Sequence, residues 1–126
     1  MAFLQSYTFD SSEKILRINT DEVQGVQRDI QAIGVHLICA SITGSGNMTV
    51  EQGNTDDESQ AVAVNIVDPA DGSTTAVVQA ISTGNFFVSF YGADACKNIY
   101  LRFPATLTGG TCAIHGNLDF TVVDDS

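Results

Sequence analysis

Clusters of turn-forming residues divide the chain into short apolar runs, and this pattern limits what it can fold into. Runs of five to nine residues, rich in β-branched and aromatic side chains, alternate with clusters of Gly, Asn, Asp, Ser and Thr. Turn signals at this spacing favour an all-β fold, a two-sheet antiparallel β-sandwich of the jelly-roll kind. The predicted strands are Ile15–Asn19, Val35–Ile42, Asn47–Gln52, Ala61–Val67, Thr74–Ala80, Phe86–Tyr91, Asn98–Phe103, Thr111–His115 and Leu118–Val122.

The first thirty residues are predicted to be distinct from the rest. We expect residues 1–30 to form an N-terminal arm or edge strands that dock or oligomerise, followed by a β-sandwich domain over 31–126. The window with the best helical spacing, 21–34, is weakened by Gly25 and by its β-branched residues, so strand or irregular structure is expected there. A chain of 126 residues can bury one core without metal or disulfide staples.

Alternation within the strands assigns side chains to faces. The segment NIYLRF (98–103) is predicted to have Ile99, Leu101 and Phe103 inside, and Asn98, Tyr100 and Arg102 outside. We expect Arg102 to pair with a carboxylate on a neighbouring strand; a ligand-binding arginine in a pocket is the alternative. The other predicted shared faces are Val62, Val64 and Ile66 in one strand, and Phe86, Val88 and Phe90 in another.

The charge balance excludes two classes of partner. Five Lys and Arg stand against fifteen Asp and Glu, for a formal net charge of −10. Nucleic acids and anionic membranes are bound through basic side chains, so neither is an expected partner. The charge is unevenly placed: residues 1–30 carry three basic against five acidic residues, net −2, and residues 31–126 carry two against ten, net −8.

The cysteines predict free thiols. Cys39, Cys96 and Cys112 are odd in number and far apart, and no secretory leader is visible at the N-terminus. We therefore expect three reduced thiols in a protein made in a reducing cytosol. Together with the two histidines, His36 and His115, they lack the number and spacing of a structural zinc site. Both histidines are predicted to lie on strand surfaces.

No motif in the sequence predicts an active site. The GSG at 44–46 lacks the lysine and the helix of a phosphate-binding loop, and no nucleophile elbow flanks a serine. The acidic stretch NTDDE (54–58) is predicted to be a solvated turn, with a calcium site left open as the alternative. We therefore expect no catalytic residue, no metal and no cofactor.

Three segments carry a resemblance to a known family. Val50–Asp57, Asn98–Phe103 and Gly110–Gly116 resemble successive strand-and-turn elements of a loose family of small β-sandwich modules in tailed-phage structural proteins. The resemblance extends over residues 35–117. The chain departs from it in having no Trp and in keeping only one of the family's two strand arginines, Arg102.

The resemblance implies a structural virion protein and not an enzyme. The leading hypothesis is a capsid decoration (cement) protein, made in the host cytoplasm and assembled into the virion. Its implied partners are the major capsid protein or another virion protein, and further copies of itself, with a homotrimer favoured. The alternative is a carbohydrate-binding module such as a tail or fibre receptor-binding domain. That role needs exposed aromatic faces, and the chain has no Trp and three Tyr.

The candidate interface residues combine the apolar N-terminal segment with polar or aromatic outer-face positions. They are Phe3, Leu4, Tyr7, Phe9, Tyr91, Tyr100 and Arg102.

Overall fold

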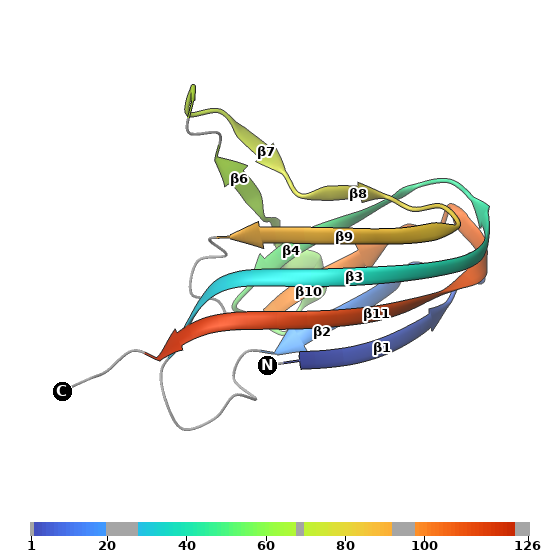
Figure 1. Cartoon of the computed structure of the whole chain (residues 1–126), viewed down its shortest axis with the longest axis horizontal. Coiled ribbons are helices and arrows are strands. Elements are labelled where there is room, and N and C mark those ends of the chain that lie inside the picture. Colours follow the sequence, from blue (N-terminus) through green and yellow to red (C-terminus); the bar gives the residue numbers. More distant parts are fainter. Residues whose placement is uncertain (1, 20–27, 68–69, 92–97, 123–126) are drawn as a thin grey trace.

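The computed structural model describes residues 2–19, 28–67, 70–91 and 98–122, which form two antiparallel sheets packed face to face (Figure 1). The predicted β-sandwich is confirmed. The long sheet has the order β1 (Ala2–Thr8), β11 (Leu107–Val122), β3 (Arg28–Gly44), β9 (Gly84–Tyr91). The short sheet has the order β2 (Lys14–Asn19), β10 (Asn98–Phe103), β4 (Asn47–Gly53), β5 (Val62–Ala63), and β8 (Val78–Ala80) also pairs with β4. A separate ribbon joins β6 (Asn65–Val67) to β7 (Thr74–Ala76).

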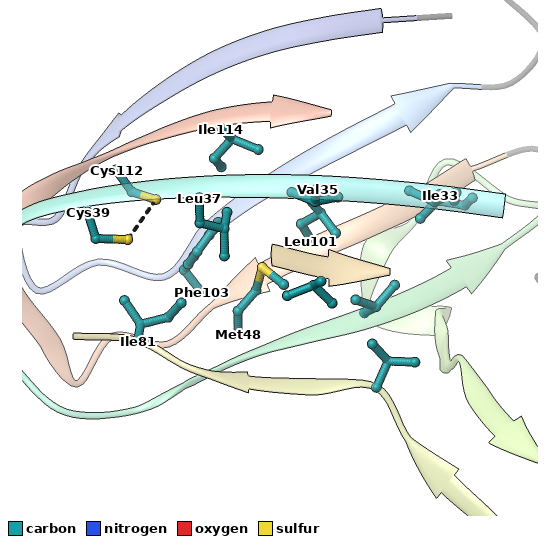
Figure 2. Close-up of a cluster of buried hydrophobic side chains, with 14 of the residues drawn as sticks. Ile33, Val35, Leu37, Cys39, Met48, Ile81, Leu101, Phe103, Cys112 and Ile114 are labelled. Atoms are coloured by element: carbon teal, nitrogen blue, oxygen red, sulfur yellow. Dashed lines mark hydrogen bonds between the residues drawn. The ribbon is translucent and has the colours of Figure 1, made fainter. Parts of the chain in front are cut away.

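The core lies between the two sheets and follows from the alternation of apolar residues along their strands (Figure 2). Burying each large side chain contributes about 1.5–3 kcal/mol. The long sheet supplies Ile33, Val35, Leu37, Cys39, Val88, Cys112 and Ile114, and the short sheet supplies Ile18, Met48, Val50, Ile99, Leu101 and Phe103. The inward face predicted for Ile99, Leu101 and Phe103 is thus confirmed.

The last strand is longer than predicted. A break was expected at Gly116-Asn117, but β11 runs without interruption from Leu107 to Val122. Gly116 is central in the long sheet because it pairs with Val35 on one side and Phe3 on the other. Ladder hydrogen bonds on both sides of β11 therefore override the local preference of Gly-Asn for a turn.

The other central strand is also longer than predicted. β3 begins at Arg28, inside the window where strand or irregular structure was expected and seven residues before the predicted start at Val35, and it pairs along its length with β11. The register between β3 and β11 shifts near both ends: between Asp119 and Phe120 at the start of β3, and on both sides of Gly109 at its end, where Gly110 has a φ of 103°. A left-handed backbone at this point suits glycine and bends the pair of strands.

Two predicted strands are each divided in the structure. Ala61–Val67 becomes β5 and β6, and Thr74–Ala80 becomes β7 and β8. The divisions fall at Val64 and Val77, which are both buried. Backbone hydrogen bonds link them: Val77 N donates to Val64 O at 3.0 Å, and Val64 N donates to Val50 O at 3.0 Å. Beyond them the β6–β7 ribbon projects from the sandwich (Figure 1).

The division at Val64 corrects one face assignment. Val62 is 61% exposed while Val64 is 1% exposed, so they do not share the predicted face. The side chain of Ile66 lies outside the described part. In β9 the predicted alternation is confirmed for Phe86 and Val88, which pack inward, and for Phe87, which is 68% exposed.

The N-terminal segment enters both sheets. β1 is an outer strand of the long sheet and pairs with β11, and β2 is an outer strand of the short sheet and pairs with β10. Phe9, between them, is buried in the core and its N–H bonds Gly110 O at 2.9 Å. A docking or oligomerising role for residues 1–30 stays a prediction. Within the described ranges, no helix has the length and apolarity to cross a membrane.

Candidate interaction surfaces

Arg102 is held in a cluster on the outer side of the short sheet. Its Nε donates to Glu51 Oε2 at 2.7 Å and its Nη2 to Glu51 Oε1 at 3.3 Å, so the pair is bidentate. Nη1 donates to Glu13 Oε1 at 2.5 Å, and Nη2 to the Glu58 carbonyl at 3.1 Å. The predicted pairing with a carboxylate on a neighbouring strand is confirmed, because Glu51 lies on β4 beside β10. These bonds to Glu51 and Glu13 raise the pKa of Arg102.

The outer side of β10 is covered by the segment 54–60, which the sequence did not predict. Asn98 Nδ2 and Tyr100 Oη both donate to the carbonyl of Thr55, at 3.0 Å and 3.1 Å. Asn98 and Tyr100 are therefore 0% and 1% exposed, although they do lie on the outer side of the sheet. The short sheet consequently presents this polar segment, not strand side chains, over β10.

The same segment uses its acidic groups within the protein. Asp57 Oδ1 accepts from Ser59 N at 3.0 Å and Ser59 Oγ at 2.6 Å, which caps the 3-10 turn Glu58–Gln60 and lowers the Asp57 pKa. Asp56 pairs with Arg17 at 3.5 Å and accepts from Asn98. No group of three or more His, Cys, Asp or Glu able to hold a metal occurs in the described ranges, this acidic turn included.

The predicted interface residues fall into different environments. Leu4 is 66% exposed on β1, whereas Tyr7 is half-buried and packs on Phe103 with ring centroids 5.7 Å apart. Phe9 and Tyr100 are buried, so they lack the exposure that an interface role in the folded chain requires. Phe3 and Tyr91 lie in β1 and β9, and their side chains are outside the described part. Arg102 is 22% exposed within its cluster.

Sequence reasoning missed a row of side chains across the outer face of the long sheet. The ladder registers place Leu4 opposite His115, His115 opposite His36, and His36 opposite Phe87. Ring centroids are 6.2 Å apart for the two histidines and 6.4 Å apart for His36 and Phe87. Each histidine lies on a strand surface, as predicted. Phe87 extends over Gly34, where an added Cβ would lie 3.0 Å from the ring.

The side chains in the neighbouring rows are uncharged and, apart from Ile38, small or amide-bearing. The described outward positions of the four strands are Leu4, Ser6 and Thr8; Thr111, Ala113, His115 and Asn117; Gly34, His36, Ile38 and Ala40; and Asn85, Phe87 and Ser89. None of them is Asp, Glu, Lys or Arg. Ile38 adds a further exposed apolar side chain, at 41%. We call this surface the neutral face.

The two sides of the sandwich therefore differ in charge. Around the outer side of the short sheet gather Glu13, Glu51, Asp56, Asp57 and Glu58 with Arg17 and Arg102. At the positions named above, the neutral face can lose its water without desolvating a carboxylate, and desolvation of carboxylates is the main obstacle to contact for a chain of net charge −10. The side chain of Asp119, two residues beyond Asn117 on β11, lies outside the described part. The uncharged residues of this face can be read from the sequence, but grouping them on one surface requires the register between strands that are far apart in the chain.

The comparisons with known proteins show the fold alone. No protein-family model matches the chain, and no curated protein matches it. The crystal structure of the SPBc2 prophage-derived protein YomS is similar, with a TM-score of 0.54, 10% sequence identity, and coverage of 94% of this chain and 96% of that one. The coat protein of Tobacco streak virus has a TM-score of 0.39 and 7% identity over 98% of this chain and 91% of that one, a likeness too weak to support an argument.

Proposed function

We propose that this chain is a structural protein of a phage virion, and specifically a capsid decoration protein that binds the outer surface of the head. The observation that carries the proposal is the neutral face on a strongly acidic chain. The similarity of fold to a prophage-derived protein over nearly the whole of both chains supports it. So does the resemblance of residues 35–117 to structural modules of tailed phages.

The charge distribution suits this role. In the proposed arrangement the neutral face docks on the shell, and the acidic short-sheet side faces the surroundings. Exposed Phe87 and Ile38 supply apolar contact, and the surrounding Ser, Thr, Asn and Ala side chains allow close approach to another flat surface. The outward negative charge keeps particles apart and resists binding to nucleic acid.

The test is binding to heads of the phage that encodes the chain. Purified protein is mixed with heads that lack it, and the bound fraction is measured by sedimentation. Wild type should bind, and Phe87→Glu and Ile38→Glu should each weaken binding by tenfold or more, because each buries an unpaired carboxylate at the contact. Val62→Glu adds the same charge at a 61% exposed position of the short sheet, so it is the matched control and should bind like wild type.

Three results would contradict the proposal. Wild type that binds tails but not heads would place the protein elsewhere in the virion. Phe87→Glu and Ile38→Glu that bind like wild type would remove the neutral face from the contact. Capture of wild type on a glycan array, lost in Phe87→Glu, would favour the carbohydrate-binding alternative; among the three tyrosines that alternative relied on, Tyr100 is buried.

A further inference from the structure

Two thiols face each other inside the long sheet. Cys39 on β3 and Cys112 on β11 are direct partners in the ladder, and their Sγ atoms are 3.1 Å apart (Figure 2). Both are free thiols in the structure, as the sequence predicted for them, and they are 4% and 0% exposed. The third cysteine, Cys96, lies outside the described residues.

The backbone already provides the geometry of a disulfide. Directly opposite residues of an antiparallel pair have Cα atoms about 4.5 or 5.5 Å apart, and a disulfide requires about 4.4–6.8 Å. The two sulfur atoms would need to approach by about 1 Å to reach a bond length near 2.05 Å. Rotation of the side chains can supply that movement without displacing either strand.

We infer that Cys39 and Cys112 form an oxidation site, which closes to a disulfide when a low-molecular-weight disulfide such as oxidised glutathione is the oxidant. The Cys39 thiolate attacks one sulfur of the oxidant, forms a mixed disulfide and releases one reduced thiol. The Cys112 thiolate then attacks Cys39 Sγ and displaces the second. Overall, two protein thiols are oxidised, one oxidant disulfide is reduced, and both protons end on the released thiols.

Burial controls the rate of this reaction. It raises the pKa of both thiols, so little thiolate is present at neutral pH. The oxidant must also reach a site closed by the core. The ladder is irregular close by, with a register shift between Thr111 and Gly109 and a left-handed Gly110. Opening of the strands there would expose the pair, so oxidation should follow local unfolding and be slow in the native state.

The disulfide would join the two central strands of the long sheet beside their bend. It would link residues 73 positions apart, a long loop, and should raise the melting temperature by roughly 10 °C. If the proposed function holds, the pair would stay reduced during assembly in the cell and close after release into an oxidising medium. The chemistry itself does not depend on that function.

The test uses the isolated protein and oxidised glutathione. Cys96→Ser retains the proposed pair and is the main variant, with Cys39→Ala/Cys112→Ala as the control that retains only Cys96. After refolding in a glutathione redox buffer, Cys96→Ser should have no thiol open to alkylation, and peptide mapping should recover a Cys39–Cys112 link. The double variant should form no intramolecular link and show no gain in melting temperature.

The folded protein supplies the second measurement. Native Cys96→Ser should form the same link far more slowly than refolding protein, and faster as denaturant is added below the unfolding transition. Two alkylated thiols after both treatments would overturn the inference, as would a wild-type link that involves Cys96. Failure to bind phage heads would leave these results unchanged, so the inference and the proposed function fail separately.

Discussion

Arg102 and Glu51 form a bidentate ion pair between adjacent strands of the short sheet, with contacts of 2.7 Å and 3.3 Å. Their side chains are 22% and 17% exposed, so water screens the pair only in part. Glu13 and the carbonyl of Glu58 complete the donor set of the guanidinium. Arg102 thus ties β10, β4, the segment before β2 and the 3-10 turn together.

Replacement of Arg102 should therefore cost more than an exposed ion pair. A fully exposed ion pair contributes at most about 1 kcal/mol. With Glu51 left without its partner, we expect Arg102→Ala to lower the free energy of unfolding by about 2 kcal/mol. Arg102→Lys keeps the charge but cannot make the bidentate contact, so its free energy of unfolding should lie between those of wild type and Arg102→Ala. Urea denaturation measures all three proteins, and an Arg102→Lys variant as stable as wild type would contradict the bidentate role.

Gly110 is expected to be essential to the bend of β11. Its φ is 103°, and an added Cβ would lie 2.6 Å from Ser41 O and 2.8 Å from Ala40 O. Gly72 is the matched control, because its φ of 73° is also left-handed but nothing lies within 4 Å of an added Cβ. Gly110→Ala should therefore lose about 2 kcal/mol more stability than Gly72→Ala. Equal losses in thermal denaturation would mean that the backbone at Gly110 can move aside.

Tyr7 should make stability fall at high pH. Burial raises its pKa from about 10 to about 12, because the phenolate is poorly solvated beside Phe103. A raised pKa in the folded state gives stability that is complete below pH 10 and is lost as pH rises through about 12. Tyr7→Phe removes this titration, so its stability should decline less over that window than that of wild type. If the stability of both proteins declined equally over this window, groups other than Tyr7 would be responsible for the loss of stability at high pH.

Local patterns predicted most of the sandwich but not its long-range pairing. Alternation placed Ile99, Leu101 and Phe103 in the core, and the Arg102–carboxylate pairing followed from it. Gly116-Asn117 was read as a turn because the two neighbours of β11 that satisfy its backbone come from distant parts of the chain.

The candidate surface was harder to predict for the same reason. Covering of Tyr100 by the acidic segment depends on a hydrogen bond between residues 45 positions apart, which no local pattern encodes. The row from Leu4 to Phe87 joins four strands from both halves of the sequence. Each of its members looks ordinary in its own strand. Only the register shows that an uncharged surface results.

The last prediction is a homotrimer that forms along β1. Leu4 is 66% exposed on this outer strand, at the margin of the neutral face, where copies of an acidic chain can meet without opposing carboxylates. Removing residues 1–12 would be a poor test, because it would take a strand from the long sheet and Phe9 from the core.

Leu4→Glu is the sharper variant for this test. Light scattering should give three copies for wild type and one for Leu4→Glu, with unchanged circular dichroism, because the introduced carboxylates would repel across the contact. Val62→Glu carries the same added charge on the short sheet and should stay trimeric. Phe87→Glu should also stay trimeric while losing affinity for heads, which separates self-association from docking. A wild-type monomer, or a trimer in Leu4→Glu, would contradict assembly along β1.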